Sequence, residues 1–170
     1  MQEIENILAL KELKRRGWLL RGIKDCESVA DHSYSAAALC LIFCPPNLNR
    51  EKVLSIAIIH DLAEPIIGDI TPYDNVPAEA KLEKERKAMR SVTGDKGLLK
   101  LFDEYIDQSS PEARFVLLMD KLDMCLQAKR YCSQGRLSRK ELEEFFIKPS
   151  LPFLKGSGFE KLLTSRSPRQ

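Results

Sequence analysis

The chain contains only two histidines, and each stands beside an aspartate in a largely apolar segment. The two contexts are Ala30-Asp31-His32-Ser33 and Ile59-His60-Asp61-Leu62. Imidazole and carboxylate groups are costly to bury unless they are hydrogen-bonded or bind an ion. A single histidine of this kind is most simply a hydrogen-bonded core residue, whereas two of them favour a shared metal ion.

His32, His60 and Asp61 would offer a metal two nitrogen ligands and one oxygen ligand. This mixed set suits Mn, Co, Fe, Ni or Zn and matches Ca or Mg poorly. We expect the fourth ligand to be an aspartate from another part of the chain. Asp120 is the best candidate, because it interrupts the apolar stretch that begins at Leu117 in a long predicted helix, where an unpaired carboxylate is costly. The sequence therefore predicts one divalent transition-metal ion with these ligands.

A glutamate and three arginines near these residues indicate the chemistry that the ion would take part in. Glu64 follows His60 by about one helical turn, so on a continuous helix the two side chains share a face and Glu64 points at the open coordination positions. Cations for a phosphate group are found at Arg15, Arg16 and Arg21, and a guanidinium group binds phosphate bidentately. The sequence leaves open whether Arg15 or Arg16 does so, and solvated surface charges are the alternative for each.

The sequence around these residues resembles a known family. The matching segments are Glu27-Ser28-Val29-Ala30-Asp31-His32-Ser33, His60-Asp61-Leu62-Ala63-Glu64-Pro65-Ile66-Ile67-Gly68-Asp69-Ile70 and Asp120-Lys121-Leu122. Together they resemble the HD-domain metal-dependent phosphohydrolase superfamily and, within it, the small 5′-deoxynucleotidase-like branch. The dipeptide His-Asp is a weak signal, but the extended pattern is specific, and the resemblance runs from about Leu13 to Lys129.

The resemblance implies an all-helical domain, one divalent cation and hydrolysis of the 5′-phosphate of a deoxynucleoside monophosphate. It implies that the cation is held by His32, His60, Asp61 and Asp120. It also implies that Glu64 lies beside the water that the metal activates, and that Asp69 lies at the mouth of the site near the sugar or a water. The sequence departs from the pattern at Pro65, which directly follows Glu64.

Trp18 is the only tryptophan, and it has two interpretations. It either presents its ring to the nucleoside or fills the core, as an isolated tryptophan usually does. Two alternatives to a 5′-deoxynucleotidase also remain. One is a phosphohydrolase for another small substrate, such as a nucleoside triphosphate, a cyclic nucleotide or a sugar phosphate. The other is a metal-stabilised binding module without catalysis, against which Glu64 and Asp69 argue, because a structural ion needs no carboxylates at its open side.

The elements that must position these residues are predicted to be helices. Apolar residues recur at helical spacing, and Ser28, Asn49 and Ser110 are expected N-caps. The expected helices cover Ile4 to about Gly17, Ser28 to about Phe43, Asn49 to Pro65, Pro77 to Val92, Ser110 to about Ser133, and a last segment that begins at Ser138. Between them we expect an irregular segment from Trp18 to Asp25 and a functional loop from Pro65 to Pro77. The charges of the fourth helix are interpreted as a solvated face.

Length and composition set the remaining expectations. With 170 residues, the chain is predicted to be a single globular all-α bundle, with an HD domain over residues 1–163 and a frayed tail over 164–170. Lys and Arg number 27 against 25 Asp and Glu, which lacks the basic excess expected of a protein that binds polymeric nucleic acid. No apolar run approaches the ~20 residues of a membrane span.

The cysteines and the apolar helix faces predict the compartment and the assembly. Five cysteines without a CxxC pair argue against a disulfide framework and predict a reducing, cytoplasmic compartment. The family resemblance and the several apolar helix faces predict a homodimer or a larger homo-oligomer.

Overall fold

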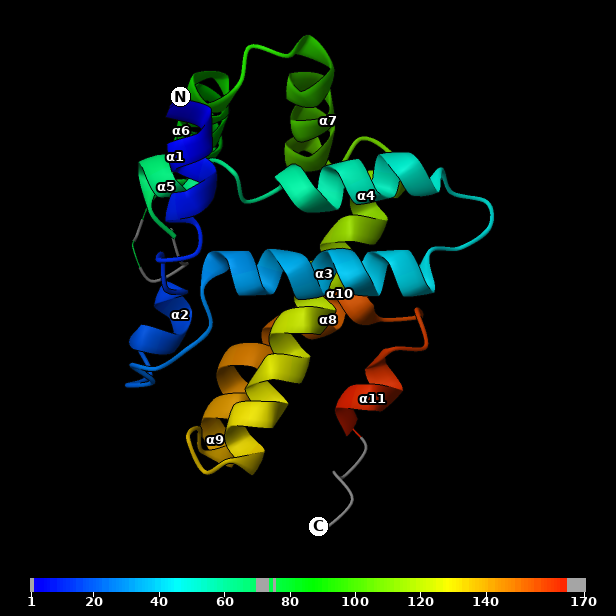
Figure 1. Ribbon diagram of the computed structural model, residues 1–170. Helices are drawn as coiled ribbons and strands as arrows, with labels where there is room; N and C mark the ends of the chain where they lie inside the picture. Colours follow the sequence, from blue (N-terminus) through cyan, green and yellow to red (C-terminus); the bar gives the residue numbers. More distant parts are fainter. Residues whose placement is uncertain (1, 70–73, 75, 165–170) are drawn as a thin grey trace. The chain divides into compact units, whose positions relative to one another are not determined.

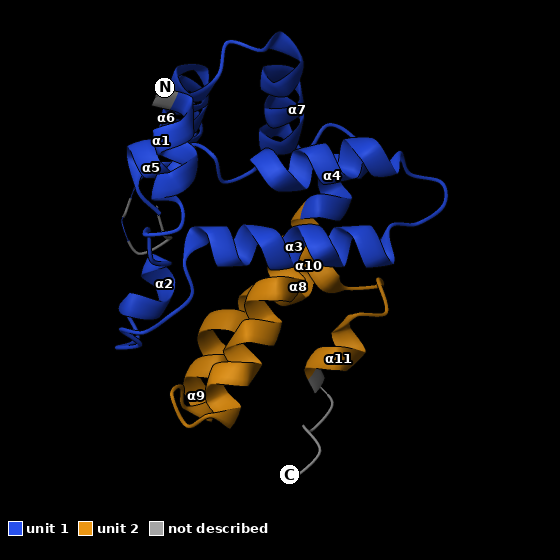
Figure 2. Cartoon of the chain, in the orientation of Figure 1, with its two compact units in different colours: residues 1–116 blue, residues 117–170 orange. Residues whose placement is uncertain are grey.

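The computed structural model describes residues 2–69, 74 and 76–164. All regular elements among these residues are helices, which confirms the all-α prediction, and an isolated β-bridge joins Lys14 to Ser28. The chain divides into two compact units, residues 1–116 and 117–170 (Figure 2). The boundary of the HD domain at residue 163 stays a prediction, and residues 165–170 of the expected tail lie outside the described residues.

The described residues of the first unit form helices α1 to α7 and the first turns of α8 (Figure 1). They are α1 Gln2–Ala9, α2 Arg16–Leu19, α3 Val29–Phe43, α4 Arg50–Ile59, α5 Glu64–Ile67, α6 Ala78–Val92, α7 Lys96–Asp107 and α8 Pro111–Ser133. Helix α3 packs along α4, α4 packs against α7, and α6 packs against both α5 and α7. Ile59, Ala63, Met89 and Phe102 are buried together where α4, α6 and α7 meet.

Helix α3 begins and ends where the sequence predicts. The Ser28 side chain accepts a hydrogen bond from the backbone N–H of Asp31, and the Asp31 carboxylate accepts one from the backbone N–H of Ser28. This capping box fixes the first turn of the helix. The buried face carries His32, Ala36 and Cys40 at a spacing of four residues, and Cys40 is buried there as a small apolar residue.

The expected first helix, from Ile4 to about Gly17, is wrong in its extent. Helix α1 ends at Ala9, and α2 begins at Arg16, so Gly17 and Trp18 lie inside a short helix. The chain between them runs beside the start of α3, where Leu10 and Leu13 carbonyls accept hydrogen bonds from the N–H groups of Ala30 and Val29. The first N–H groups of a helix have no partner within it, and this pairing outweighs the helical preference of residues 10–15.

The expected third helix, from Asn49 to Pro65, is wrong at its end. Asn49 caps α4 as predicted, but α4 ends at Ile59, residues 60–63 form turns, and Pro65 lies in the first turn of α5. Proline has no N–H to donate to the carbonyl four residues earlier and clashes with it. The Asp61 carbonyl instead accepts a hydrogen bond from Glu64 N–H at 3.0 Å. The expected loop from Pro65 to Pro77 thus begins as α5, and its residues 70–73 and 75 lie outside the described residues.

Helix α7 was not predicted. The Asp95 side chain caps it by accepting hydrogen bonds from the N–H groups of Gly97 and Leu98 at 2.7 and 3.0 Å. Arg86 of α6 holds α7 in place through ion pairs with Asp103 at 3.2 Å and Asp107 at 2.5 Å. Part of the charge on α6 therefore pairs with its neighbour.

The second unit contains the rest of α8 and the helices that follow. They are α9 Arg139–Glu141, the π-helix η2 Leu142–Ile147, α10 Lys148–Leu154 and α11 Glu160–Thr164. The predicted capping box of Ser138 and Glu141 is confirmed, because each residue's side chain accepts the other's backbone N–H. Within the described residues, no helix is both long enough and apolar enough to cross a membrane.

Candidate metal and phosphate site

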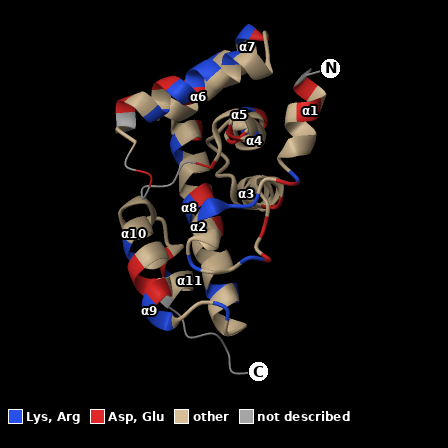
Figure 3. Cartoon of the chain, turned by 90° about the vertical axis from the view of Figure 1, so that its left-hand side faces the viewer, with Lys and Arg blue, Asp and Glu red and all other residues tan. Residues whose placement is uncertain are grey.

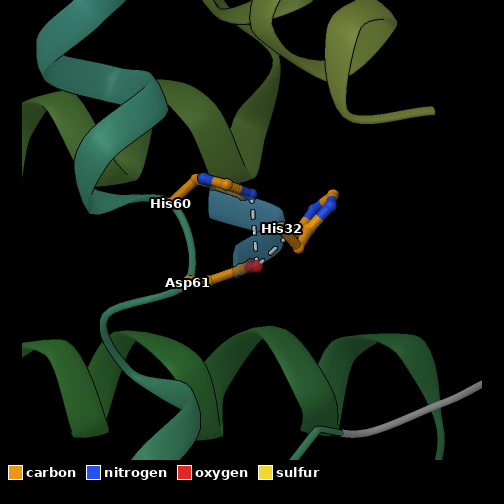
Figure 4. A group of neighbouring side chains, drawn as sticks. All are labelled: His32, His60 and Asp61. Atoms are coloured by element: carbon orange, nitrogen blue, oxygen red, sulfur yellow. Dashed lines mark ion pairs between the residues drawn. The ribbon is translucent and has the colours of Figure 1, made fainter. Parts of the chain in front are cut away.

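Three of the predicted ligands converge in the first unit. His32 lies on α3, His60 directly follows the end of α4, and Asp61 lies in the turn after it (Figure 4). Asp61 Oδ2 lies 3.2 Å from His60 Nε2 and 3.8 Å from His32 Nε2. One ligand atom from each residue lies within 4.8 Å of the others. We call this group the His–His–Asp cluster.

The His60 ring is oriented from behind. Its Nδ1 atom lies 2.7 Å from the carbonyl oxygen of Ala57, and this carbonyl can only accept a hydrogen bond. In the neutral imidazole the proton therefore belongs on Nδ1, and the lone pair of Nε2 faces the cluster. A metal-ligating histidine is typically oriented by a hydrogen bond of this kind from its other nitrogen. The contact with Ala57 thus gives the His60 ring the orientation and the tautomer that a metal ligand needs.

Asp61 is kept ionised by its surroundings. Burial alone would raise the pKa of its carboxyl group, but the His60 and His32 imidazoles in their protonated form and the Arg15 guanidinium outweigh it. The pKa of Asp61 is therefore held well below its usual range. The Arg15 guanidinium lies 3.6 Å from Asp61 Oδ2. An ionised carboxylate is the form that ligates a cation.

The cluster fits a divalent cation. His60 Nε2, Asp61 Oδ2 and Glu64 Oε2 are buried, and none makes a hydrogen bond of normal geometry within the described residues. Buried polar atoms in folded proteins nearly always have such a partner. His60 Nε2 and Asp61 Oδ2 lie 3.2 Å apart and offer a nitrogen and an oxygen atom, which are donor types that an ion of the transition series takes.

Asp120, the predicted fourth ligand, lies on α8 in the second unit. It is buried, and its Oδ2 atom accepts a hydrogen bond from Lys121 Nζ at 2.9 Å. Its approach to the His–His–Asp cluster stays a prediction.

Glu64 is the first residue of α5. The assumption that it shares one continuous helix with His60 is wrong, because α4 ends before His60. Burial raises the pKa of Glu64 to about 10, and the negative charges of Asp61 and Asp69 add to the rise. A divalent cation in the cluster would favour the ionised form instead. Glu64 is thus a carboxyl group whose protonation depends on what binds beside it.

The two arginines before Trp18 have different partners. Arg15 faces Asp61 of the cluster, with a side chain that is 14% exposed. Arg16 turns to Asp74, with 2.6 Å between Nη2 and Oδ1, and its backbone N–H donates to Asp69 Oδ2 at 2.6 Å. Arg15 is therefore the arginine that reaches the site. Asp69 ties the segment after α5 to the start of α2, and its predicted contact with a sugar or water stays a prediction.

Trp18 is almost completely buried, at 1% exposure, and its ring N–H donates to Glu27 Oε1 at 2.8 Å. This position favours the core interpretation of the residue. The hydrogen bond fixes α2, and with it Arg15, next to the segment that leads into α3. The predicted contact between Trp18 and a nucleoside stays a prediction.

Sequence reasoning missed two residues of α6. Lys81 and Glu85 belong to the charged helix that was interpreted as a solvated face, yet the Glu85 side chain is 18% exposed and lies 3.5 Å from Lys81 Nζ. A signal was present in the spacing. Positions 81, 85, 88, 89 and 92 share one helical face, and the last three are the buried Ala88, Met89 and Val92.

The chain is similar to known proteins over most of its length. A family model described as "HD domain" matches residues 7–153. The "5′-deoxynucleotidase HDDC2" of Danio rerio is 42% identical over 154 residues, which are 86% of this chain and 76% of that protein. The human protein of the same name is 39% identical over 77% of this chain and 67% of its own length. The "5′-deoxynucleotidase hdd1" of Schizosaccharomyces pombe is 40% identical over 80% of this chain and 73% of its own length.

Two solved structures are also similar. A "conserved hypothetical protein" from Pyrococcus furiosus superposes with a TM-score of 0.78 at 34% identity, over 95% of this chain and 97% of that one. The PH0347 protein from Pyrococcus horikoshii gives a TM-score of 0.78 at 34% identity, over 95% and 98% of the two chains. The family model covers the segments that carry His32, His60, Asp61 and Asp120. The chain belongs to the HD-domain family, on the branch that holds these named 5′-deoxynucleotidases.

Proposed function

We propose that this chain is a metal-dependent phosphomonoesterase that hydrolyses the 5′-phosphate of deoxynucleoside monophosphates. The observation that carries the proposal is the His–His–Asp cluster with Arg15 beside Asp61, found in a chain about 40% identical to several proteins named 5′-deoxynucleotidase. The cluster supplies ligands for a cation, and Arg15 supplies a positive charge for an anion. A phosphate monoester needs both.

His32, His60, Asp61 and Asp120 would hold one divalent ion, which is Mn, Co, Fe, Ni or Zn by the chemistry of the donor set. When bound, such an ion polarises a phosphoryl oxygen and lowers the pKa of a water. His60 is held in position by the Ala57 carbonyl, and Asp61 stays ionised. These two properties support their assignment as ligands.

The remaining residues act on the substrate and the attacking water. Arg15 binds the phosphate, and its partial burial lets the guanidinium act with little competition from solvent. Glu64 orients the water and accepts its proton, for which its open Oε2 atom and its closeness to Asp61 are suited. Asp69 and Trp18 position the sugar side of the substrate, Asp69 through α2 and Trp18 through its contact with Glu27.

A phosphate-release screen tests the proposal. The purified chain is stripped of metal, reloaded with each divalent ion in turn, and assayed on deoxynucleotides, ribonucleotides, cyclic nucleotides and sugar phosphates. Release from 5′-deoxynucleoside monophosphates above all others supports the proposal. Preference for another phosphorylated compound would reassign the substrate, and no release with any metal would favour a binding module.

We further propose a cytoplasmic homodimer or larger homo-oligomer. None of the five cysteines forms a disulfide bond, which suits a reducing compartment. Apolar side chains on α3 are exposed, among them Tyr34 at 78% and Ile42 at 70%, and Ile58 of α4 is exposed as well. Exposed apolar patches of this kind often mark protein interfaces. Light scattering at micromolar concentration distinguishes an oligomer from a monomer.

A further inference from the structure

Helix α6 carries charged residues of both signs along its length (Figure 3). Most of them are exposed, for example Glu83, whose side chain is 74% exposed. Lys81 and Glu85 differ, because they continue the buried face formed by Ala88 and Met89. Helix α6 packs against α5, the helix that begins at Glu64, and Ala88 and Met89 share a buried cluster with Ala63, against which Ile67 of α5 packs. The pair therefore lies on the face of α6 that is turned toward α5 and not on its solvated side.

Lys81 and Glu85 form an ion pair with 3.5 Å between Lys81 Nζ and Glu85 Oε1. The two side chains are exposed to different extents, 39% for Lys81 and 18% for Glu85. A lysine ammonium on a flexible stem reaches an entering anion more readily than a buried carboxylate does. The less exposed Glu85 thus binds the Lys81 ammonium from the protein interior, and solvent and substrate reach the ammonium from its exposed side.

The pair is within electrostatic reach of the catalytic carboxylates. Burial raises the pKa of Glu85, and the charge of Asp61 adds to that rise while Lys81 opposes it. Arg15 and Lys81 both oppose the raised pKa of Glu64. A cation that acts on Glu64 also acts on a phosphate group bound beside Glu64, because Coulomb interactions depend on distance and not on the chemical identity of the partner.

The charge balance of the site calls for such a second cation. Asp61, Glu64, Asp69 and Glu85 are acidic, and Arg15 is already paired with Asp61. A phosphate monoester brings up to two more negative charges. A divalent ion would offset part of this excess, and a further cation near Glu64 would offset more of it.

We infer that Lys81 is a second phosphate-binding residue of this site, that it acts together with Arg15, and that Glu85 is the positioning residue for its ammonium group. The inference rests on the proposed phosphomonoesterase function and extends it to α6. The ligand class is a phosphate monoester or the free phosphate that hydrolysis releases.

The test compares three variants of the metal-loaded full-length chain, Lys81→Met, Lys81→Arg and the control Lys84→Met. Lys84 is an exposed lysine on the same helix. Calorimetry with inorganic phosphate gives the Kd, and steady-state assays with dAMP give kcat and KM. We expect Lys81→Met to raise the Kd of phosphate and the KM of dAMP by about tenfold, as loss of one charged contact does, with a smaller change in kcat. Lys81→Arg keeps both values within about threefold of the wild type, since it keeps the charge.

Glu85→Gln tests the positioning role. It keeps the size of the side chain but removes the charge that holds Lys81. We expect a rise of about threefold in KM and in the phosphate Kd, with kcat and the unfolding midpoint unchanged, as weakening of one partly exposed ion pair predicts. A residue that only supports the fold would instead lower the unfolding midpoint and leave the ratio of kcat to KM alone.

Failure of the inference and failure of the proposed function are distinguishable. A wild-type chain that cleaves dAMP while Lys81→Met binds phosphate within twofold of the wild type would refute the role of Lys81 alone. No measurable binding of phosphate by the wild type would refute it too. A chain that releases no phosphate from any deoxynucleotide, but whose phosphate affinity falls in Lys81→Met and not in Lys84→Met, would refute the proposed function and leave the anion site of Lys81 standing.

Discussion

His60 and Asp61 are neighbours in the chain, and their side chains nevertheless converge, with 3.2 Å between His60 Nε2 and Asp61 Oδ2. On a regular helix, adjacent side chains point about 100° apart. The convergence is possible because α4 ends at Ile59 and the chain turns through residues 60–63. The break in the helix is therefore what lets both residues face His32 on α3.

Replacing either residue with alanine is expected to release the metal. The wild type should carry about one transition-metal ion per chain, and His60→Ala or Asp61→Ala should fall well below half occupancy, because removing one ligand of a mixed site weakens the hold of the others. Elemental analysis after dialysis measures this. Glu83→Ala, at an exposed position of α6, is the control. Full occupancy in both site variants would mean that the ligands are elsewhere.

Arg15 and Arg16 are expected to differ in their effect on substrate affinity. Arg15 faces Asp61, whereas Arg16 pairs with Asp74. Arg15→Ala should raise the KM of a deoxynucleoside monophosphate roughly 10- to 100-fold, because a hydrogen bond to a charged group contributes about 1.5–3 kcal/mol. Arg16→Ala should change KM only a few-fold, because Arg16 forms an ion pair with Asp74 and does not face Asp61. Equal effects of the two substitutions in steady-state kinetics would contradict the assignment of Arg15.

Glu64→Gln is expected to keep the metal and the fold but to lose catalysis. General acid–base catalysis contributes about 10²- to 10⁴-fold, so kcat should fall by that order. In the metal-free chain the same substitution should change the unfolding midpoint at pH 7 very little, since the pKa of Glu64 is raised to about 10 and the glutamine resembles the protonated form. Kinetics and thermal unfolding check the two halves separately. Near-normal turnover would leave Glu64 without a catalytic role.

The predictable part of the fold and site was the part encoded locally. The boundaries of α3 follow from the Ser28 capping box at its start and from Pro45 and Pro46 after its end. The histidines and aspartates of the site are recognisable because they interrupt apolar segments. The extent of α1 and α4 was mispredicted because it depends on distant or specific contacts. The carbonyls of Leu10 and Leu13 accept hydrogen bonds from Ala30 and Val29 and do not take part in a helix. Pro65 has no N–H for the carbonyl four residues earlier, so its effect on the helix falls on the residues that precede it.

The roles of α6 and α7 could not be read from charge alone. Lys81, Glu85 and Arg86 look like any solvated charges in the sequence, and only the packing of α6 on α5 and α7 gives them partners. The choice between Arg15 and Arg16 needed the register of the segment before α2, which backbone pairing with Glu27 fixes. The family resemblance identified the ligands, whereas these contacts are specific to the three-dimensional structure.

Stability at acidic pH is expected to depend on Lys52. Its ammonium lies 2.7 Å from Glu104 and 3.3 Å from Glu112, and the backbone N–H of Asn49 donates to Glu112. A hydrogen bond from Lys52 lowers the pKa of Glu104. Burial alone would raise the pKa of Glu112, but its hydrogen bonds from Asn49 and Lys52 lower it below the usual 4.5.

A carboxyl group with a lowered pKa stabilises the folded state above its unfolded pKa, and this contribution is lost as pH falls through the folded value. The loss should therefore occur below about pH 4.5. Lys52→Met should lower the free energy of unfolding by about 1 kcal/mol at pH 7, and the difference from the wild type should shrink as pH falls from 5 to 3. Denaturation at several pH values measures it. A difference that does not change with pH would mean that the ion pairs contribute nothing.

The last expectation concerns which phosphorylated substrate is preferred, and it follows from the charges of the residues around the site. Arg15 and Lys81 both act on Glu64, and two cations suit one phosphate group better than three, since a triphosphate calls for more positive charge. The segment from Pro65 to Pro77 adds two acids, Asp69 and Asp74, and no lysine or arginine. We expect higher kcat/KM for dAMP than for dATP or 3′-dAMP.

The preference for dAMP over AMP tests the interpretation of Trp18 in which its ring lies beside the sugar and its bulk disfavours a 2′-hydroxyl. Trp18→Ala removes a buried side chain and is expected to lower stability by about 3–5 kcal/mol, so Trp18→Leu and Trp18→Phe are the more useful variants. Both lose the hydrogen bond to Glu27, but Phe keeps an aromatic ring in place. Competitive assays with dAMP and AMP should show a narrower deoxy-to-ribo ratio for Leu than for Phe. Equal deoxy-to-ribo ratios in the wild type and in both variants would mean that Trp18 does not set the selectivity. Equal rates of the wild type on dAMP and AMP would overturn the deoxynucleotide preference but would not affect the assignment of the metal ligands.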